Sequence, residues 1–221
     1  LGTDQISTGL PLFEDKYEDV GYGSSVKFDW KPTVHSVILG SDLDKKVLES
    51  NTIADKQGIR KWAFFVNDTM VPDRISITPG IRYEKTNTND AVTSPSLGVT
   101  YNFTSTIVRA YTAKGFNIPP VSYTYGNTVF YSPNPDLKVE RVQSYQVGAE
   151  TTVLPSLWLK LSAFRNEIRD AISFVPDTAS TFIAVNSDRQ RRQGIEAELK
   201  TIPFYSVTVS AGAEFVSARD L

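Results

Sequence analysis

The residues that could carry out chemistry are few and scattered in this chain. His35 is the only histidine, and cysteine is absent, so a metal site built from histidine and cysteine ligands cannot form, nor can a cysteine nucleophile. A serine hydrolase would need His35 together with a Gly-x-Ser-x-Gly elbow, and the sequence has no such elbow. A glycine-rich loop that would cradle phosphates is also missing. We therefore expect no catalytic residue, no metal site, no cofactor and no enzymatic activity.

Residues suited to binding are concentrated in an aromatic stretch in the middle of the chain. Residues 121–127 read Val-Ser-Tyr-Thr-Tyr-Gly-Asn, and Phe-Tyr follows at 130–131. Tyrosine supplies contact area at a low cost in conformational entropy, and loops on a rigid scaffold often carry recognition. Tyr123, Tyr125, Asn127 and Tyr131 are therefore candidate ligand-binding residues. The same rings could equally be anchors at a lipid interface.

The densest basic cluster consists of Arg189, Arg191 and Arg192. Such a cluster could bind an anionic ligand or lipopolysaccharide, and Arg189 and Arg191 join the candidate binding residues on that reading. A solvated loop end would explain the same three arginines without any ligand.

The elements that must position these residues are strands, because apolar residues recur with a period of two. In residues 74–85, Ile75, Ile77, Ile81 and Tyr83 share one face, whereas charged and small residues occupy the other. Pro79 lies within this strand and cannot donate to a ladder, which predicts a bulge or a local edge there. Similar alternation recurs to the end of the chain and predicts an all-β antiparallel meander of about ten strands. No comparable stretch has helical periodicity.

The connections between these strands alternate in length. Short turns are predicted at residues 31–33, 71–73, 103–105, 154–156 and 203–205, and long loops at about 49–59, 86–93, 116–143 and 170–190. Strands of about 10 residues joined alternately by short turns and long loops are typical of transmembrane β-barrels. The apolar faces are predicted to carry aromatic residues near the strand ends, as interfacial girdles require; these are Trp30, Trp62, Tyr83, Tyr101, Tyr111 and Phe215. A soluble β-sandwich is the alternative.

The composition of the chain narrows the possible classes of protein. Hydrophobic residues make up 40% of the 221, less than is usual for a soluble globular domain. The formal charge of −2 argues against a nucleic-acid partner, which requires a concentrated basic surface. No run of 18 apolar residues exists, so no transmembrane helix is predicted.

An ordered series of segments resembles the TonB-dependent outer-membrane receptors. Residues 62–69 (Trp-Ala-Phe-Phe-Val-Asn-Asp-Thr) and 72–84 resemble a strand–turn–strand of that family, and residues 94–99 resemble its next strand. Residues 115–120, 134–140 and 194–199 continue the series in the family's order, with Val139 where the family usually has proline. The resemblance covers roughly residues 21–218.

The resemblance implies a partial barrel domain at residues 21–221, preceded by an irregular loop at residues 1–20. It implies a bacterial outer-membrane receptor for a scarce, bulky ligand such as a metal chelate, for example a ferric siderophore, or cobalamin. The expected partners are outer-membrane lipid, the small-molecule ligand and the TonB complex, which would act through a plug domain that this chain lacks. A passive porin-like channel and a soluble binding or adhesion domain are the alternatives.

Around residues 134–150, the expected arrangement can be stated residue by residue. A proline-stiffened loop on the outer surface leads into a strand whose two faces differ. Tyr145 and Val147 should face lipid together with Ala149, whereas Gln146, Gly148 and Glu150 should face the lumen. Arg82, Glu84, Glu196 and Glu198 should line the lumen as well.

Overall fold

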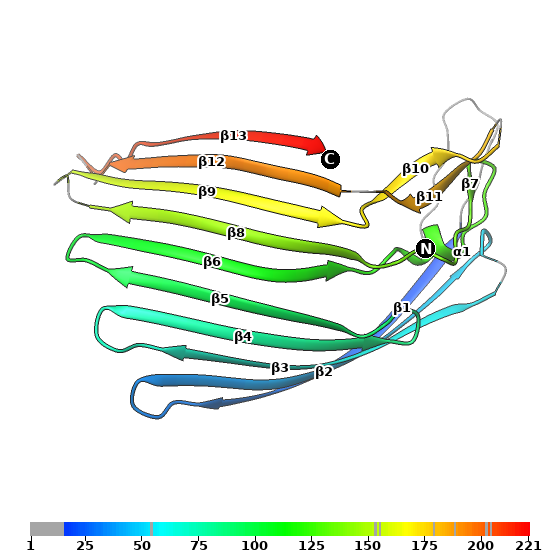
Figure 1. The fold of residues 1–221 in the computed structure, drawn as a ribbon, viewed down its shortest axis with the longest axis horizontal. Helices are drawn as coiled ribbons and strands as arrows, with labels where there is room; N and C mark the ends of the chain where they lie inside the picture. Colours follow the sequence, from blue (N-terminus) through cyan, green and yellow to red (C-terminus); the bar gives the residue numbers. More distant parts are fainter. Residues whose placement is uncertain are drawn as a thin grey trace.

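One long, curved antiparallel sheet dominates the computed structural model (Figure 1). The structure describes residues 16–221 except 54, 153, 155, 179, 188, 202 and 204. Ten strands form the sheet in the order β1-β2-β3-β4-β5-β6-β8-β9-β12-β13. Their bounds are β1 Tyr17–Trp30, β2 His35–Ser50, β3 Gln57–Met70, β4 Ile75–Thr86, β5 Val92–Asn102, β6 Thr106–Asn117, β8 Glu140–Thr151, β9 Leu157–Arg169, β12 Arg189–Thr201 and β13 Ser210–Asp220.

The connections emerge alternately at two ends of the sheet, as predicted, but their lengths follow the prediction only in part. The connection between β12 and β13, predicted as a short turn at 203–205, spans residues 202–209 and is longer than the loops at 51–56 and 87–91. Tight turns close one end, called the turn end; there Asp73 adopts a φ of 56° and Thr33 a φ of 44°. Asp is one of the residues that tolerate this left-handed region, which a tight reversal requires. The two longest connections, at residues 118–139 and 170–188, emerge at the opposite end, called the loop end (Figure 1).

The elements outside the large sheet lie at the loop end. They are the short helix α1 (Val121–Tyr125) and a three-stranded sheet in the order β10-β11-β7. Strand β7 spans Tyr131–Ser132, β10 Ile172–Pro176 and β11 Phe182–Asn186. Hydrogen bonds join the two long loops: the Phe182 N–H donates to the Phe130 carbonyl over 2.8 Å, and Asn134 Nδ2 donates to the Ala184 carbonyl over 2.8 Å.

The large sheet has an apolar face and a polar face, as the period of two requires. The apolar face bears exposed side chains such as Val147 (57% exposed), Leu161 (52%), Ile195 (54%) and Phe215 (73%). The polar face carries the alternate residues, including Arg82, Glu150 (opposite Lys160) and Glu196 (opposite Ser162). Such a broad exposed apolar surface indicates an apolar covering.

The soluble-sandwich alternative is wrong. A sandwich needs a second sheet packed face to face on the first, and the three-stranded sheet covers only the loop end (Figure 1). Trp62 is 39% exposed, and among the described residues no large side chain is fully buried. No helix in the described part of the chain is long and apolar enough to cross a membrane.

Three local predictions need correction. Strand β1 begins at Tyr17, so residues 17–20 are strand rather than loop, and residues 1–15 lie outside the described part. Of the bulge or local edge predicted at Pro79, the bulge is absent, because the register from Asn67↔Gly80 to Met70↔Ile77 contains no extra residue. The β3–β4 pairing is nevertheless interrupted between these two pairs, as expected for a local edge, while Pro79 keeps its pairing with Leu97 on β5. Tyr111, predicted on the apolar face, lies on the polar face, because its register partners Gly98 and Gln146 are on that face.

Candidate functional site

A groove of about 540 Å³ opens at the loop end between the polar face of β1–β3 and the connection after β6. The strands contribute charged residues of both signs, and Lys61 Nζ lies 3.1 Å from an Asp44 carboxylate oxygen. The connection contributes an apolar wall that includes Ile118 and Pro120. This loop-end groove therefore combines an apolar wall with paired and unpaired charges.

An aromatic trio lies in the same layer of loops. The Tyr123 ring centroid is 4.9 Å from that of Phe174 in an edge-to-face arrangement, and the Tyr131 ring centroid is 5.1 Å from Phe174. The Tyr123 carbonyl also accepts a hydrogen bond from the Asn134 N–H over 3.0 Å. Two of the predicted binding residues thus meet around Phe174, which the sequence did not indicate because β10 is too short to show a pattern.

The other two residues of the aromatic stretch have different surroundings. Tyr125 lines a small cleft beside Asn89 and Leu137. The Asn127 N–H donates to the Thr52 carbonyl over 2.8 Å, which ties this stretch to the β2–β3 loop. Tyr125 remains a candidate contact for a ligand, whereas the backbone of Asn127 has a structural role.

The predicted arginine cluster is divided between the two faces. Arg192 lies on the polar face, 5.9 Å above the Phe164 ring centroid, with its guanidinium 3.9 Å from Glu214. Arg189 and Arg191 lie on the apolar face and do not reach the loop-end groove.

On the apolar face, the register brings Arg189 and Arg191 together with further cations at the loop end. We call these seven residues the cationic band: Lys114, Arg141, Arg165, Arg169, Arg189, Arg191 and Arg219. The carboxylate of Glu167 lies within the band. Arg165 donates to it from Nε over 3.0 Å, and Arg191 Nη2 lies 3.4 Å from it.

At the loop end of β1–β3, acidic residues share the apolar face with the cations. Glu18 is opposite Glu49, and Lys45 is opposite Arg60. Lys56, in the loop between β2 and β3, donates from Nζ to Glu49 over 3.0 Å, which raises the pKa of Lys56.

A charge network occupies the polar face of β1–β4. Arg82 donates from Nη1 to Asp42 over 2.7 Å and from Nη2 to Glu84 over 3.0 Å, and Ser25 Oγ donates to Asp42 over 2.7 Å. The Arg82 guanidinium also lies 5.5 Å from the Phe65 ring centroid. Glu84 is only 7% exposed. The guanidinium is therefore paired with two carboxylates, one of them buried.

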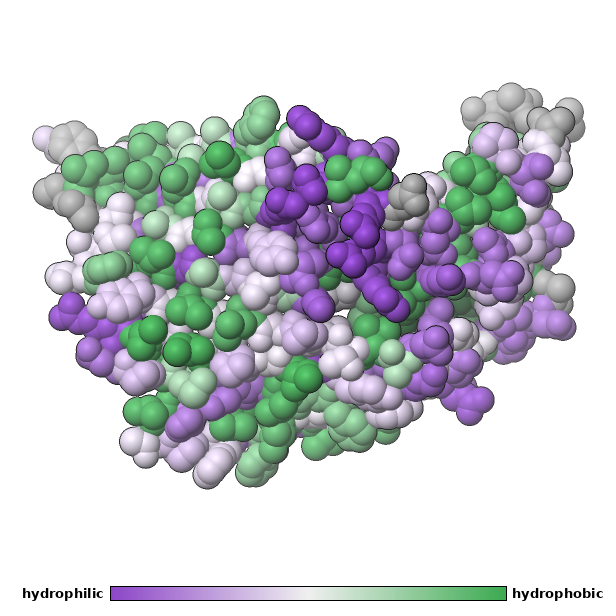
Figure 2. All heavy atoms as spheres, viewed as in Figure 1, coloured by the Kyte–Doolittle hydropathy of each residue, from purple (hydrophilic) through white to green (hydrophobic). Residues whose placement is uncertain are grey.

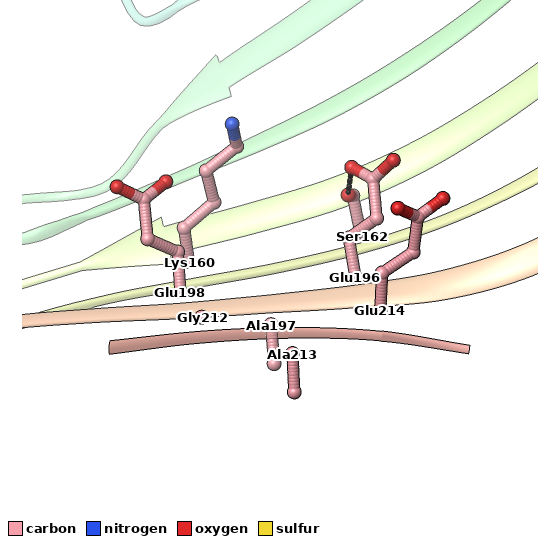
Figure 3. Close-up of a pocket in the computed structure, with 8 residues that line it drawn as sticks. All are labelled: Lys160, Ser162, Glu196, Ala197, Glu198, Gly212, Ala213 and Glu214. Atoms are coloured by element: carbon pink, nitrogen blue, oxygen red, sulfur yellow. Dashed lines mark hydrogen bonds between the residues drawn. The ribbon is translucent and has the colours of Figure 1, made fainter. Parts of the chain in front are cut away.

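A second groove on the polar face is acidic. It lies between β9, β12 and β13, has a volume of about 330 Å³, and is lined by Lys160, Ser162, Glu196, Glu198 and Glu214. Figure 3 shows these side chains on one side of the sheet and Ala197 and Ala213 on the other. Ser162 Oγ donates to Glu196 over 3.0 Å. No cluster of three or more potential metal-ligating side chains occurs in the described part of the chain.

This arrangement has counterparts among known proteins. A family model described as "TonB dependent receptor-like, beta-barrel" matches residues 4–220. The chain belongs to this family. The match confirms the resemblance inferred from the ordered segments, and the sheet has the architecture expected for part of a receptor barrel.

The proteins similar to this TonB-dependent receptor chain are named as receptors or transporters of different ligands. The vitamin B12 transporter BtuB of Vibrio vulnificus is 36% identical over 90 residues, which cover 40% of this chain and 14% of that protein. The siderophore receptor PirA of Pseudomonas aeruginosa has a TM-score of 0.81 at 18% identity, covering 93% of this chain and 41% of that one. The FrpB iron transporter of Neisseria meningitidis has a TM-score of 0.76 at 13% identity, covering 93% and 36%.

The chain thus spans less than half the length of these relatives, and the structural likeness shows a shared fold. Within that fold the polar face corresponds to the inside of the barrel and the apolar face to its outside. The outward orientation of Tyr145 and Val147 and the inward orientation of Gln146 and Glu150 follow the predicted alternation.

Sequence reasoning missed Lys46 and Lys61 of the loop-end groove. The alternation in β2 and β3 was readable, but the cleft exists only because residues 118–122 fold back over those strands.

Proposed function

We propose that this chain forms part of the wall and mouth of an outer-membrane receptor that imports a scarce, bulky ligand such as a ferric siderophore or cobalamin. The family match over residues 4–220 carries this proposal. The names of the relatives, which include a siderophore receptor, an iron transporter and a vitamin B12 transporter, support the class of ligand. Receptors of this kind are bacterial barrel proteins, so outer-membrane lipid is the expected surrounding.

The loop-end groove is the proposed first contact for the ligand. Its volume of about 540 Å³ is within the range of small-molecule sites, which are mostly apolar with a few convergent polar groups. The apolar wall at Ile118 and Pro120 would pack on a ligand body, while Lys46 would offer charge to acidic groups on it; Lys61 is already paired with Asp44. Tyr123 and Tyr131 would extend this surface through the aromatic trio.

We further propose that uptake is energised by the TonB complex acting on a plug supplied by residues outside this chain. Force on a plug is needed because a barrel of this class is closed by it, in contrast to a water-filled porin. A passive channel would instead admit solutes without energy.

Uptake by cells that produce the full-length receptor tests the proposal. Radiolabelled ferric siderophores and cobalamin would be supplied in turn to a deletion strain, with and without a plasmid copy of the gene and in TonB-positive and TonB-deficient backgrounds. We expect uptake of one ligand class only in the complemented, TonB-positive strain. Equal uptake in the TonB-deficient strain would indicate a passive channel, and no gene-dependent uptake of either class would reject the proposed ligands.

The contribution of the aromatic trio can be tested in the same strain. The double variant Tyr123→Ala/Tyr131→Ala should weaken ligand binding about five- to tenfold, because two aromatic contacts are lost. Tyr101→Ala is the matched control, since Tyr101 also belongs to an aromatic pair, with Phe103 at 4.6 Å, but lies at the turn end. Equal loss in both variants would assign the trio to folding rather than to ligand binding.

A further inference from the structure

The cationic band is a charged surface in an unusual place, next to the lipid-facing residues of the same strands. In β12, Ile195 and Arg191 are on the same face and four residues apart, which corresponds to roughly 13 Å along a strand. Figure 2 shows hydrophilic residues gathered over the loop ends of the last strands, beside a largely hydrophobic area. The order along each strand is therefore apolar first and cationic beyond it.

The charge of the band is largely uncompensated. Glu167 contacts Arg165 and Arg191, whereas Lys114, Arg141, Arg169, Arg189 and Arg219 form no ion pair with any residue that the structure describes. Arg191 Nε is buried and has no hydrogen-bond partner within that same part of the chain. An unpaired donor of this kind is costly unless an external acceptor satisfies it.

The excess of positive charge is limited to the cationic band and does not extend along the whole loop end of the apolar face. The loop end of β1–β3 mixes Lys45 and Arg60 with Glu18 and Glu49 on the same face. A partner of the cationic band must therefore be anionic and must lie against the barrel wall formed by β6 to β13.

We propose that the cationic band binds the phosphate groups of an outer-leaflet glycolipid, as in lipopolysaccharide, while the lipid chains lie on the apolar surface next to it. This inference rests on the proposed outer-membrane location. Six of the seven cations are arginines, whose planar guanidinium can hold a phosphate through two parallel hydrogen bonds. Adjacent strands are about 4.8 Å apart, so the rows present guanidinium groups side by side along the membrane plane.

A lipid fits this position better than an acidic protein does. Charges above an apolar band match the order of headgroup and acyl chains in a membrane leaflet, and long basic side chains reach toward the interface from such positions. An acidic protein would have to approach the band from within the plane of the membrane, where lipid already covers the wall.

Binding of lipid A to the purified full-length receptor tests the proposal. The receptor in detergent micelles would be titrated with bis-phosphorylated lipid A, with lipid A from which the phosphates have been removed, and with inorganic phosphate. We expect saturable binding of the phosphorylated lipid that weakens as salt is raised. Equal binding of the dephosphorylated lipid, or of phosphate alone at similar concentrations, would overturn the proposal.

A charge-matched pair of variants locates the site. Arg141→Gln/Arg169→Gln/Arg189→Gln removes three cations of the band, whereas Lys45→Gln/Arg60→Gln/Lys85→Gln removes three cations from the other half of the apolar face. The first variant should lose at least tenfold in affinity for lipid A and the second less than twofold. Replacing the same three arginines of the band with lysine keeps the charge but loses the paired hydrogen bonds, so this variant should lose clearly less affinity than the Gln variant. That difference separates loss of charge from misfolding. Equal losses in the two Gln variants would overturn the assignment to the band.

Ligand uptake in the same strains separates this proposal from the proposed function. If the protein fractionates with the outer membrane and binds lipid A through the band but imports no ligand, only the transport proposal fails. Normal uptake by a receptor that does not discriminate phosphorylated from dephosphorylated lipid A would reject the lipid site alone.

Discussion

The charge network on the polar face and the cationic band on the apolar face differ in how their charges are paired. In the network, one guanidinium meets two carboxylates, with Arg82 bound to Asp42 and Glu84 at 2.7 and 3.0 Å. In the band, the Glu167 carboxylate is surrounded by several cations, and most of these have no partner among the described residues. Arg82, Asp42 and Glu84 each have an ion-pair partner within the chain, whereas most cations of the band need an external anion for pairing.

This difference indicates what each group of charges does. Paired charges that are partly removed from water hold neighbouring strands in place, and removing one partner leaves the other desolvated and uncompensated. Unpaired, exposed charges contribute little to folding and are available for binding. The two regions should therefore respond differently to the loss of a single arginine.

The largest expected effect is the loss of Arg82. Arg82→Met keeps the length of the side chain but leaves Asp42 and the buried Glu84 without their cation. The free energy of unfolding should fall by about 2–3 kcal/mol, measured from the shift of the urea midpoint of the receptor in detergent.

A double-mutant cycle shows whether the ion pair itself is responsible. If the network acts as described, Arg82→Met combined with Asp42→Asn should cost less than the sum of the two single losses, because the second change removes a charge that is already unpaired. Simple additivity would mean that Arg82 stabilises the sheet through packing alone.

A smaller effect is expected from Gly40, which supports the same network from β2. A Cβ at this position would lie 2.7 Å from Phe65 Cε1, so the ring must move away from Gly40. The ring then also leaves the Arg82 guanidinium, which lies 5.5 Å from its centroid. Gly40→Ala should lower the free energy of unfolding by about 1–2 kcal/mol.

Gly115→Ala is the matched control, since Gly115 is in β6 and an added Cβ would have nothing within 4 Å. Its effect should stay within about 0.5 kcal/mol. If the two alanine variants unfold at the same urea concentration, the close approach of Phe65 to Gly40 does not limit stability.

The sequence predicted the sheet well because alternation is a local property. Each strand carries its own period of two, so the outward orientation of Val147 and the inward orientation of Glu150 could be read without knowing any neighbour. Tyr111 was misplaced because its aromatic ring suggested an interfacial anchor, although its register position next to Gly98 puts it on the polar face. Residue type was the weaker guide.

The site was harder to predict because it depends on contacts between loops. Tyr123 and Tyr131 were identified from composition, but their partner Phe174 is 51 and 43 residues away from them in sequence. It reaches them through the pairing of β10 with β11 and of β11 with β7. The prediction of a single arginine cluster was wrong for a different reason. Neighbouring residues of a strand point to opposite faces, so Arg191 and Arg192 cannot act as one site.

The smallest expected effect on stability comes from the cationic band itself. Arg169 is exposed, and the structure gives it no ion pair with any described residue. Arg169→Gln should therefore change the free energy of unfolding by less than about 0.5 kcal/mol in detergent without lipopolysaccharide. The same variant measured with phosphorylated lipid A present should gain less stability from the lipid than the wild-type receptor does, because a ligand stabilises the folded state in proportion to its affinity for that state. A large loss without lipid would show that Arg169 is paired within the folded receptor, and the contrast between the band and the charge network would then disappear.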